Sequence, residues 1–150
     1  MKRFLLTLIA LGFAGNLMAA QYGLAGTFLA GGTQHVKGAS TSNYTSSLVL
    51  TKYDDVALYI NFSQYNAAQG SNVVFTFERS VDNSTWESTQ KLPITLVETG
   101  NTAVCLVTNV TVGAYGYWRL SSIQNTCTNV VAAVTNITVK VYAKPKRFGK

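Results

Sequence analysis

Hydrophobic and polar residues alternate along much of the chain after residue 46. In the segment 56–62, Val56, Leu58, Ile60 and Phe62 take every second position. A period of two is the pattern of a β-strand that buries one face. The same alternation, or a short run of β-branched and aromatic residues, predicts strands at residues 47–51, 56–62, 73–78, 85–88, 92–97, 102–112, 115–123 and 130–143.

Turn-forming residues separate these predicted strands. Gly, Asn, Asp and Ser cluster at residues 69–72, 82–84, 99–101, 113–114 and 125–126. No stretch after residue 20 has a helical period of hydrophobic positions. Short strands with turns between them are typical of sandwiches and jelly rolls. The sequence therefore predicts an all-β fold, a β-sandwich of jelly-roll or immunoglobulin-like type with about eight strands, over residues 47–143.

The first 20 residues have the order of a secretory signal. Lys2 and Arg3 precede an apolar run, and small residues around Ala20 end it. The run is too short and too often interrupted for a transmembrane span, which needs about 20 apolar residues. Two interpretations stay open: a signal that is cleaved, or a retained arm that packs against a neighbouring subunit.

Residues 21–46 are rich in Gly, Ser and Thr and predict a flexible arm. Isolated apolar residues make this segment more than a plain spacer. We expect such an arm to become ordered on a neighbouring subunit. The candidate interface residues in the arm are Tyr22, Leu24, Phe28 and Leu29.

Charged residues are scarce, and the net charge comes entirely from the two ends of the chain. Charged residues make up 12% of the sequence, and the formal net charge is +6. Residues 21–143 contain equal numbers of acidic and basic residues, so they carry no basic stripe of the kind that binds nucleic acid. The tail at 144–150 is basic, and Lys144, Lys146 and Arg147 are candidate contacts with an acidic partner surface; the alternative is a solvated tail.

Cys105 and Cys127 are the only two cysteines. In an exported protein they could form one disulfide, closing a loop of about 22 residues and worth about 3 kcal/mol. In a reducing compartment they would instead be two small buried side chains. Neither fits a metal site, because the chain has no C-x-x-C motif and its one histidine, His35, lies far away in sequence.

The sequence contains no catalytic motif. His35 lies in the glycine-rich arm, and no nucleophile elbow accompanies it. Asp54 and Asp55 are adjacent, and neighbouring side chains on a strand point to opposite faces. Neither form of glycine-rich phosphate-binding loop occurs. We expect a protein that is not an enzyme and that uses no cofactor and no metal.

An aromatic cluster occurs at Tyr115, Tyr117 and Trp118. On a strand, the two tyrosines would share one face and the tryptophan would lie on the other. The cluster could form a platform on which a sugar ring stacks. The alternative is core on one side and subunit interface on the other.

The segment from Asn72 to Ser88 resembles a known hairpin. The positions of Phe75, Ser80, Asp82 and Trp86 follow the pattern x-F-x-x-x-x-S-x-D-G-x-x-W, which is common in small β-sandwich proteins of tailed bacteriophage virions. Asn83 replaces the usual glycine, and asparagine tolerates the left-handed conformation of such a turn. The resemblance covers about 40 residues and implies that the aromatic residue packs back into the sandwich.

Two functions fit these features. The first is a non-enzymatic structural component of a bacteriophage virion: a capsid decoration, minor capsid or tail-associated protein. It would act through subunit contacts, as a homo-oligomer or within a capsid or tail lattice. The alternative is an exported cell-surface or periplasmic module that forms fibres or binds glycans. We expect no specific nucleic-acid binding and no transmembrane span in either case.

Overall fold

The computed structural model of the chain describes residues 22–32, 35–66, 71–89, 91–98, 100 and 103–146. These residues form ten strands and no helix. The strands are β1 (Gly23–Ala30), β2 (His35–Lys37), β3 (Ser40–Asn43), β4 (Ser47–Val49), β5 (Tyr53–Tyr65), β6 (Asn72–Ser80), β7 (Leu92–Val97), β8 (Ala103–Thr111), β9 (Tyr117–Asn125) and β10 (Ala133–Pro145).

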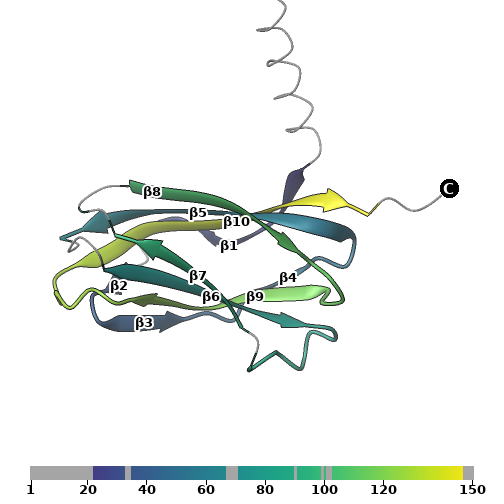
Figure 1. The fold of residues 1–150 in the computed structure, drawn as a ribbon, viewed down its shortest axis with the longest axis horizontal. Coiled ribbons are helices and arrows are strands. Elements are labelled where there is room, and N and C mark those ends of the chain that lie inside the picture. Colours follow the sequence, from purple (N-terminus) through teal and green to yellow (C-terminus); the bar gives the residue numbers. More distant parts are fainter. Residues whose placement is uncertain are drawn as a thin grey trace, which may run out of the picture.

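The strands form two antiparallel sheets packed face to face (Figure 1). Sheet A has the order β1-β10-β5-β8, with the short β2 also paired to β10; sheet B has the order β3-β9-β6-β7, with the short β4 also paired to β9. From β4 onward, every connection except that between β6 and β7 passes from one sheet to the other. Two five-stranded sheets, each with a main path of four strands and joined in this way, are a jelly roll. The all-β prediction is confirmed, with ten strands in place of about eight.

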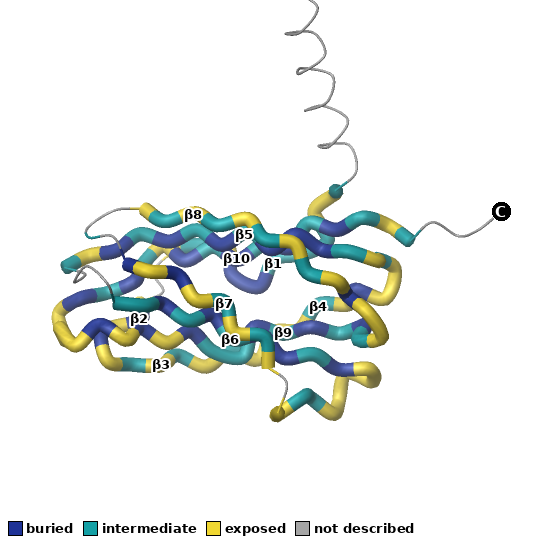
Figure 2. Tube along the Cα trace, viewed as in Figure 1, coloured by how far each residue is buried: buried dark blue, intermediate teal, exposed yellow. Residues whose placement is uncertain are grey.

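The core follows from the alternation that the sequence shows. In β5, Val56, Leu58, Ile60 and Phe62 are completely buried, whereas Tyr59 between them is only partly buried. Strand β10 alternates in the same way, as Figure 2 shows. Each strand of the sandwich therefore turns one row of side chains inward and the next row outward.

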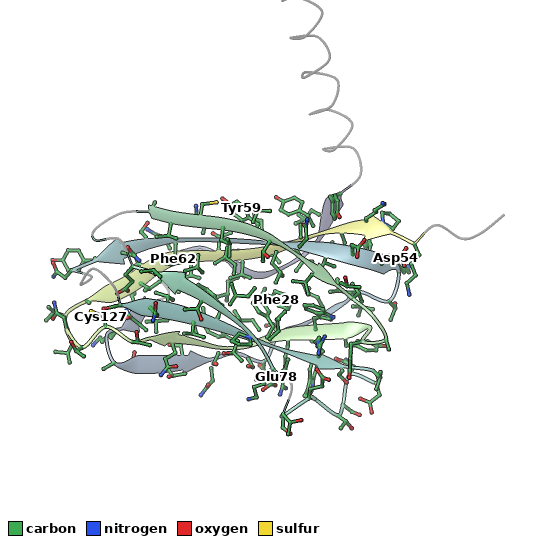
Figure 3. The ribbon with its side chains drawn as sticks, viewed as in Figure 1. Phe28, Asp54, Tyr59, Phe62, Glu78 and Cys127 are labelled. Atoms are coloured by element: carbon green, nitrogen blue, oxygen red, sulfur yellow. The ribbon has the colours of Figure 1, made fainter. Side chains whose placement is uncertain are left out.

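Aromatic side chains from both sheets meet in this core. Phe62 of sheet A lies 5.7 Å from Phe75 of sheet B, measured between ring centroids, and Phe28 lies 5.6 Å from Phe77. Figure 3 shows Phe28 and Phe62 between the two layers. These tilted pairs join the sheets, and aromatic pairs of this kind contribute about 1 kcal/mol beyond the area they bury.

The prediction of a flexible arm is wrong for residues 23–43, which belong to the folded sandwich. Most of this segment forms β1, β2 and β3, and Phe28 and Leu29 lie in the chain's own core with 6% and 7% exposure. Two of its glycines permit close packing. A side chain at Gly26 would collide with Leu48, and one at Gly38 would collide with the backbone of Asn129.

The remaining boundaries differ in smaller ways. The predicted strand at 85–88 is absent, because that segment is part of the loop between β6 and β7. Strand β10 continues through Lys144 to Pro145, and the N–H of Lys146 donates to the Lys52 carbonyl at 2.9 Å, so the start of the predicted tail belongs to the domain. The signal-like segment 1–20 and the residue Arg147 lie outside the described residues.

Candidate functional site

A tight turn follows β6 and carries the residues of the hairpin motif. The Asp82 carboxylate accepts hydrogen bonds from the N–H groups of Ser84 at 2.9 Å and Thr85 at 2.8 Å, and from the Ser80 hydroxyl at 2.9 Å. The hydrogen bonds from the backbone N–H groups of Thr85 and Ser84 lower the pKa of the Asp82 carboxyl far below its usual range. Asn83 has a φ of 62°, the left-handed conformation expected at that position.

This turn places Trp86 on the outside of sheet B. The N–H of Glu87 donates to the Arg79 carbonyl at 3.0 Å, and the two side chains form an ion pair at 2.9 Å. The Trp86 ring then lies 4.4 Å from the guanidinium carbon of Arg119. The resemblance implied that this aromatic residue packs into the sandwich, and the structure corrects this: Trp86 forms a cation–π contact on the outer face.

Arg119 belongs to a row of three charged side chains on that face. Arg119 and Glu78 are cross-strand partners in β9 and β6, and Lys91 directly precedes β7 on the other side of β6. A carboxylate oxygen of Glu78 lies 2.6 Å from a guanidinium nitrogen of Arg119, and the other lies 2.6 Å from the Lys91 ammonium. Because Phe77 points inward, its neighbour Glu78 points outward, as Figure 3 shows.

Glu78 is 6% exposed, so its charge needs these partners. Burial alone would raise the pKa of its carboxyl, but the hydrogen bonds and charges of Lys91 and Arg119 outweigh burial and lower the pKa. The carboxylate therefore stays ionised, and the row has one more positive charge than negative charges.

A pocket of about 240 Å³ opens beside this row. Its lining combines the three charged side chains with one aromatic residue and several hydroxyl and amide groups: Asn43, Tyr44, Thr45, Glu78, Lys91, Arg119, Ser121 and Ser122. We call the outer face of sheet B, which contains this pocket, the B face.

The outer face of sheet A, here called the A face, has a different character. Its outward residues on the four main strands include Leu24, Thr27 and Ala30 of β1, Thr138, Lys140, Tyr142 and Lys144 of β10, Asp55, Ala57, Tyr59, Asn61 and Ser63 of β5, and Ala103, Cys105, Val107, Asn109 and Thr111 of β8. Among these, Lys140 is the one charge near the centre, and Asp55 and Lys144 are cross-strand neighbours toward one end.

Tyr59 and Cys105 interact on the A face. The contact with the Cys105 thiol raises the pKa of the Tyr59 hydroxyl. Figure 3 shows Tyr59 on the outer side of the sandwich, opposite to Glu78. Leu24 and Val107 add apolar surface to this face, since their exposed fractions are 58% and 62%.

Of the two possibilities left open for the cysteines, the structure does not form the disulfide. Cys105 is exposed on β8 in sheet A, whereas Cys127 is buried after β9 in sheet B, and the two are not joined. The even number of cysteines permitted a pair, but the structure places Cys105 on β8 of sheet A and Cys127 in the loop between β9 and β10.

Of the two interpretations of the aromatic cluster, the structure agrees with the one that places part of it in the core. Trp118 is completely buried, and its indole N–H donates to the Tyr115 carbonyl at 3.1 Å. Tyr115 lies under Arg79, 4.6 Å from its guanidinium carbon, and Tyr117 is half-buried on β9. These three residues therefore offer no common surface to a sugar ring.

The other predicted interface residues lie near sheet A. Tyr22 directly precedes β1, Leu24 belongs to the A face, and Lys144 and Lys146 lie at the end of β10. His35 is exposed on β2, and the described residues contain no group of side chains that could hold a metal. None of the described segments is an apolar helix of membrane-spanning length.

Sequence reasoning missed the charged row and Tyr44. Glu78 and Arg119 are 41 positions apart, so only the register of β6 with β9 brings them together. One signal was available: Glu78 takes an outward position in a predicted strand, in a chain that has six acidic residues.

No protein-family profile matches the sequence, and no curated protein matches it. Solved structures that align with the chain include a structure of the Gx strain of infectious bursal disease virus, with 11% identity over 80% of this chain and a TM-score of 0.46; the chain spans 36% of that protein's length. A family 16 carbohydrate-binding module aligns at 11% identity over 79% of this chain and 82% of its own, with a TM-score of 0.38. A subviral particle of infectious bursal disease virus VP2 aligns at 13% identity over 80% of this chain and 40% of its own, with a TM-score of 0.28. At these values the alignments assign the chain to no family.

Proposed function

We propose that the chain is a non-enzymatic structural component of a bacteriophage virion and that it acts through contacts between subunits on its A face. The single observation that carries this proposal is the scarcity of charge on that face. Lys140 is the only charged residue near the centre of the face among the described residues. The hairpin at residues 72–88, which resembles those of virion β-sandwiches, adds support.

The physical reason lies in what a free sheet surface needs. An outer face that remains in water usually carries charged residues, whereas the central part of a protein interface is depleted in charge and enriched in aromatic residues. The A face has this second composition, with Tyr59 and Tyr142 among hydroxyl, amide and small apolar groups. The partners in this proposal are copies of the chain or other structural proteins of the particle.

Deleting the predicted arm at residues 21–46 would not test the proposal. Removing residues 21–46 would take away β1, β2 and β3, together with Phe28 and Leu29 of the core. A loss of incorporation would then report only an unfolded domain.

A matched pair of substitutions tests the proposal without disturbing the core. Val107 on β8 and Val97 on β7 lie on the outer faces of sheets A and B, and their exposed fractions are 62% and 56%. We expect Val107→Glu to reduce incorporation into purified particles by about tenfold or more, because it buries a charge in the contact. We expect Val97→Glu to be incorporated normally. Equal incorporation of both variants, measured by mass spectrometry of the particles, would contradict the proposal.

A further inference from the structure

The pocket on the B face lies where sheet B departs from regular pairing. In the ladder between β6 and β9, Thr76 pairs with Ser122 but Phe77 pairs with Leu120. Ser121 is therefore the extra residue of a β-bulge. On a regular strand two consecutive side chains point to opposite faces, yet Ser121 and Ser122 both line this pocket.

A second irregularity meets the bulge at the sheet edge. Strand β3 ends at Asn43 and β4 begins only at Ser47, and both strands pair with β9. The residues between them leave the edge, and the N–H of Tyr44 donates to the Ser121 carbonyl at 2.9 Å. The loop is thus held by the bulge, and the pocket is a fixed feature of the fold. Bulges commonly redirect side chains toward functional sites.

The side chains around the pocket are held by contacts with one another, with Trp86 and with the core. Trp86 lies over the Arg119 guanidinium, and Arg119 and Lys91 both bind Glu78. Tyr44 packs against the hydrophobic core. A ligand would therefore meet charged and aromatic groups that are already in place, which reduces the ordering cost of binding.

The chemistry of the lining distinguishes between classes of ligand. A simple anion would compete with Glu78, which already engages both cations. A neutral polyol needs both acceptors and donors, and the pocket has both: the Glu78 carboxylate accepts, whereas Lys91 and Arg119 donate. The amide of Asn43 and the neighbouring hydroxyl groups add further partners of either kind.

We propose that this pocket binds one neutral sugar ring of a glycan. The hydroxyl groups of the ring bond to the charged row, and its apolar face packs on Tyr44, because aromatic rings combine apolar area with a polar edge. The volume of about 240 Å³ suits one ring rather than an extended chain. The site lies on the face opposite to the proposed subunit contact, so it does not depend on the proposed function.

The test uses the full chain, labelled with ¹⁵N, and free monosaccharides as probes. Glucose, galactose, mannose and N-acetylglucosamine are titrated separately to the millimolar range, and sodium sulfate serves as the anion probe. The indole N–H signals of Trp86 and Trp118 report on the site and on the core, since Trp118 is completely buried. We expect at least one sugar to shift the Trp86 signal saturably and to leave the Trp118 signal unchanged.

Two variants of β9, each with one residue replaced by tyrosine, provide a matched comparison. Ser122 and Gln124 lie two positions apart on β9 and share its outer face, but only Ser122 lines the pocket. We expect Ser122→Tyr to weaken sugar binding by about tenfold or more. We expect Gln124→Tyr to leave sugar binding unchanged, with both variants folded by near-ultraviolet circular dichroism. The proposal is overturned if no sugar binds saturably, if sulfate binds and the sugars do not, or if both variants weaken binding equally.

Discussion

The two outer faces of this sandwich use charge in different ways. All three ion pairs found among the described residues lie on the sheet B side, where they fix Trp86 and the wall of a pocket. The A face has Lys140 near its centre, surrounded by hydroxyl, amide, aromatic and small apolar groups. Both faces come from strands with the same alternation, so secondary structure alone does not distinguish them.

The difference shows how a chain with few charges can divide its surface. A row of charges that are paired with one another presents directional hydrogen bonds to a small polar ligand. A sheet surface with few charges can be buried against another protein at low desolvation cost. We therefore assign ligand binding to the B face and subunit contact to the A face.

Removing a charge from each face tests the contrast most strongly. Glu78→Ala leaves Lys91 and Arg119 without their common partner, so we expect a loss of about 2 kcal/mol in the free energy of unfolding. The loss is smaller than that for breaking a fully buried ion pair, because both cations are partly exposed. We expect Lys140→Ala to change the free energy of unfolding by less than about 0.5 kcal/mol. Urea unfolding at neutral pH measures both values, and similar losses would remove the distinction between the faces.

The pH dependence of the Glu78 effect is its control. The pKa of Glu78 is lowered in the folded chain, so its stabilisation is complete above the unfolded pKa and is lost as the pH falls through the folded pKa. The difference in stability between the original chain and Glu78→Gln should therefore be largest near neutral pH and shrink in acid. A difference that persists unchanged in acid would show that the ion pairs are not its source.

Glu98 gives a smaller effect of opposite sign and belongs to neither face. Glu98 directly follows β7 and is 1% exposed. Among the described residues, no hydrogen bond of normal geometry reaches its carboxylate oxygens. Burial raises the pKa of Glu98, and nearby Ser71 offsets part of that rise. A raised folded pKa means that stability falls as the pH rises from the unfolded pKa through the folded pKa.

We therefore expect Glu98→Gln to raise the Tm by a few degrees at neutral pH and to give no gain in acid. Thermal unfolding followed by circular dichroism at both pH values measures this effect. A lower Tm at neutral pH would mean that the ionised carboxylate stabilises the fold.

The fold was largely predictable because alternation determines strands. In β5 and β10, hydrophobic residues at every second position require one buried face, and the structure has that face. The prediction failed for β1 to β3, where glycines suggested flexibility. Gly26 and Gly38 are needed there because Leu48 and the backbone of Asn129 lie too close for a side chain. Such contacts depend on the tertiary structure, and sequence spacing does not show them.

The candidate site was much less predictable. Its floor depends on the register of β6 with β9, and its lining depends on the bulge at Ser121 and on the edge gap at Tyr44. None of these features leaves a periodic signal in the sequence. The hairpin motif did predict the left-handed Asn83, but it could not show that Trp86 would pack on Arg119.

The most direct test of the central claim uses a thiol that the chain already has on the A face. Cys105 is exposed there beside Tyr59, whereas Cys127 is buried and serves as the internal control. Thiol labelling followed by peptide mass spectrometry compares the rate of modification at Cys105 in the free chain and in assembled particles. We predict that Cys105 reacts readily in the free chain and at least about tenfold more slowly after assembly, because subunit contact covers the A face. Equal rates in the two states would contradict the account.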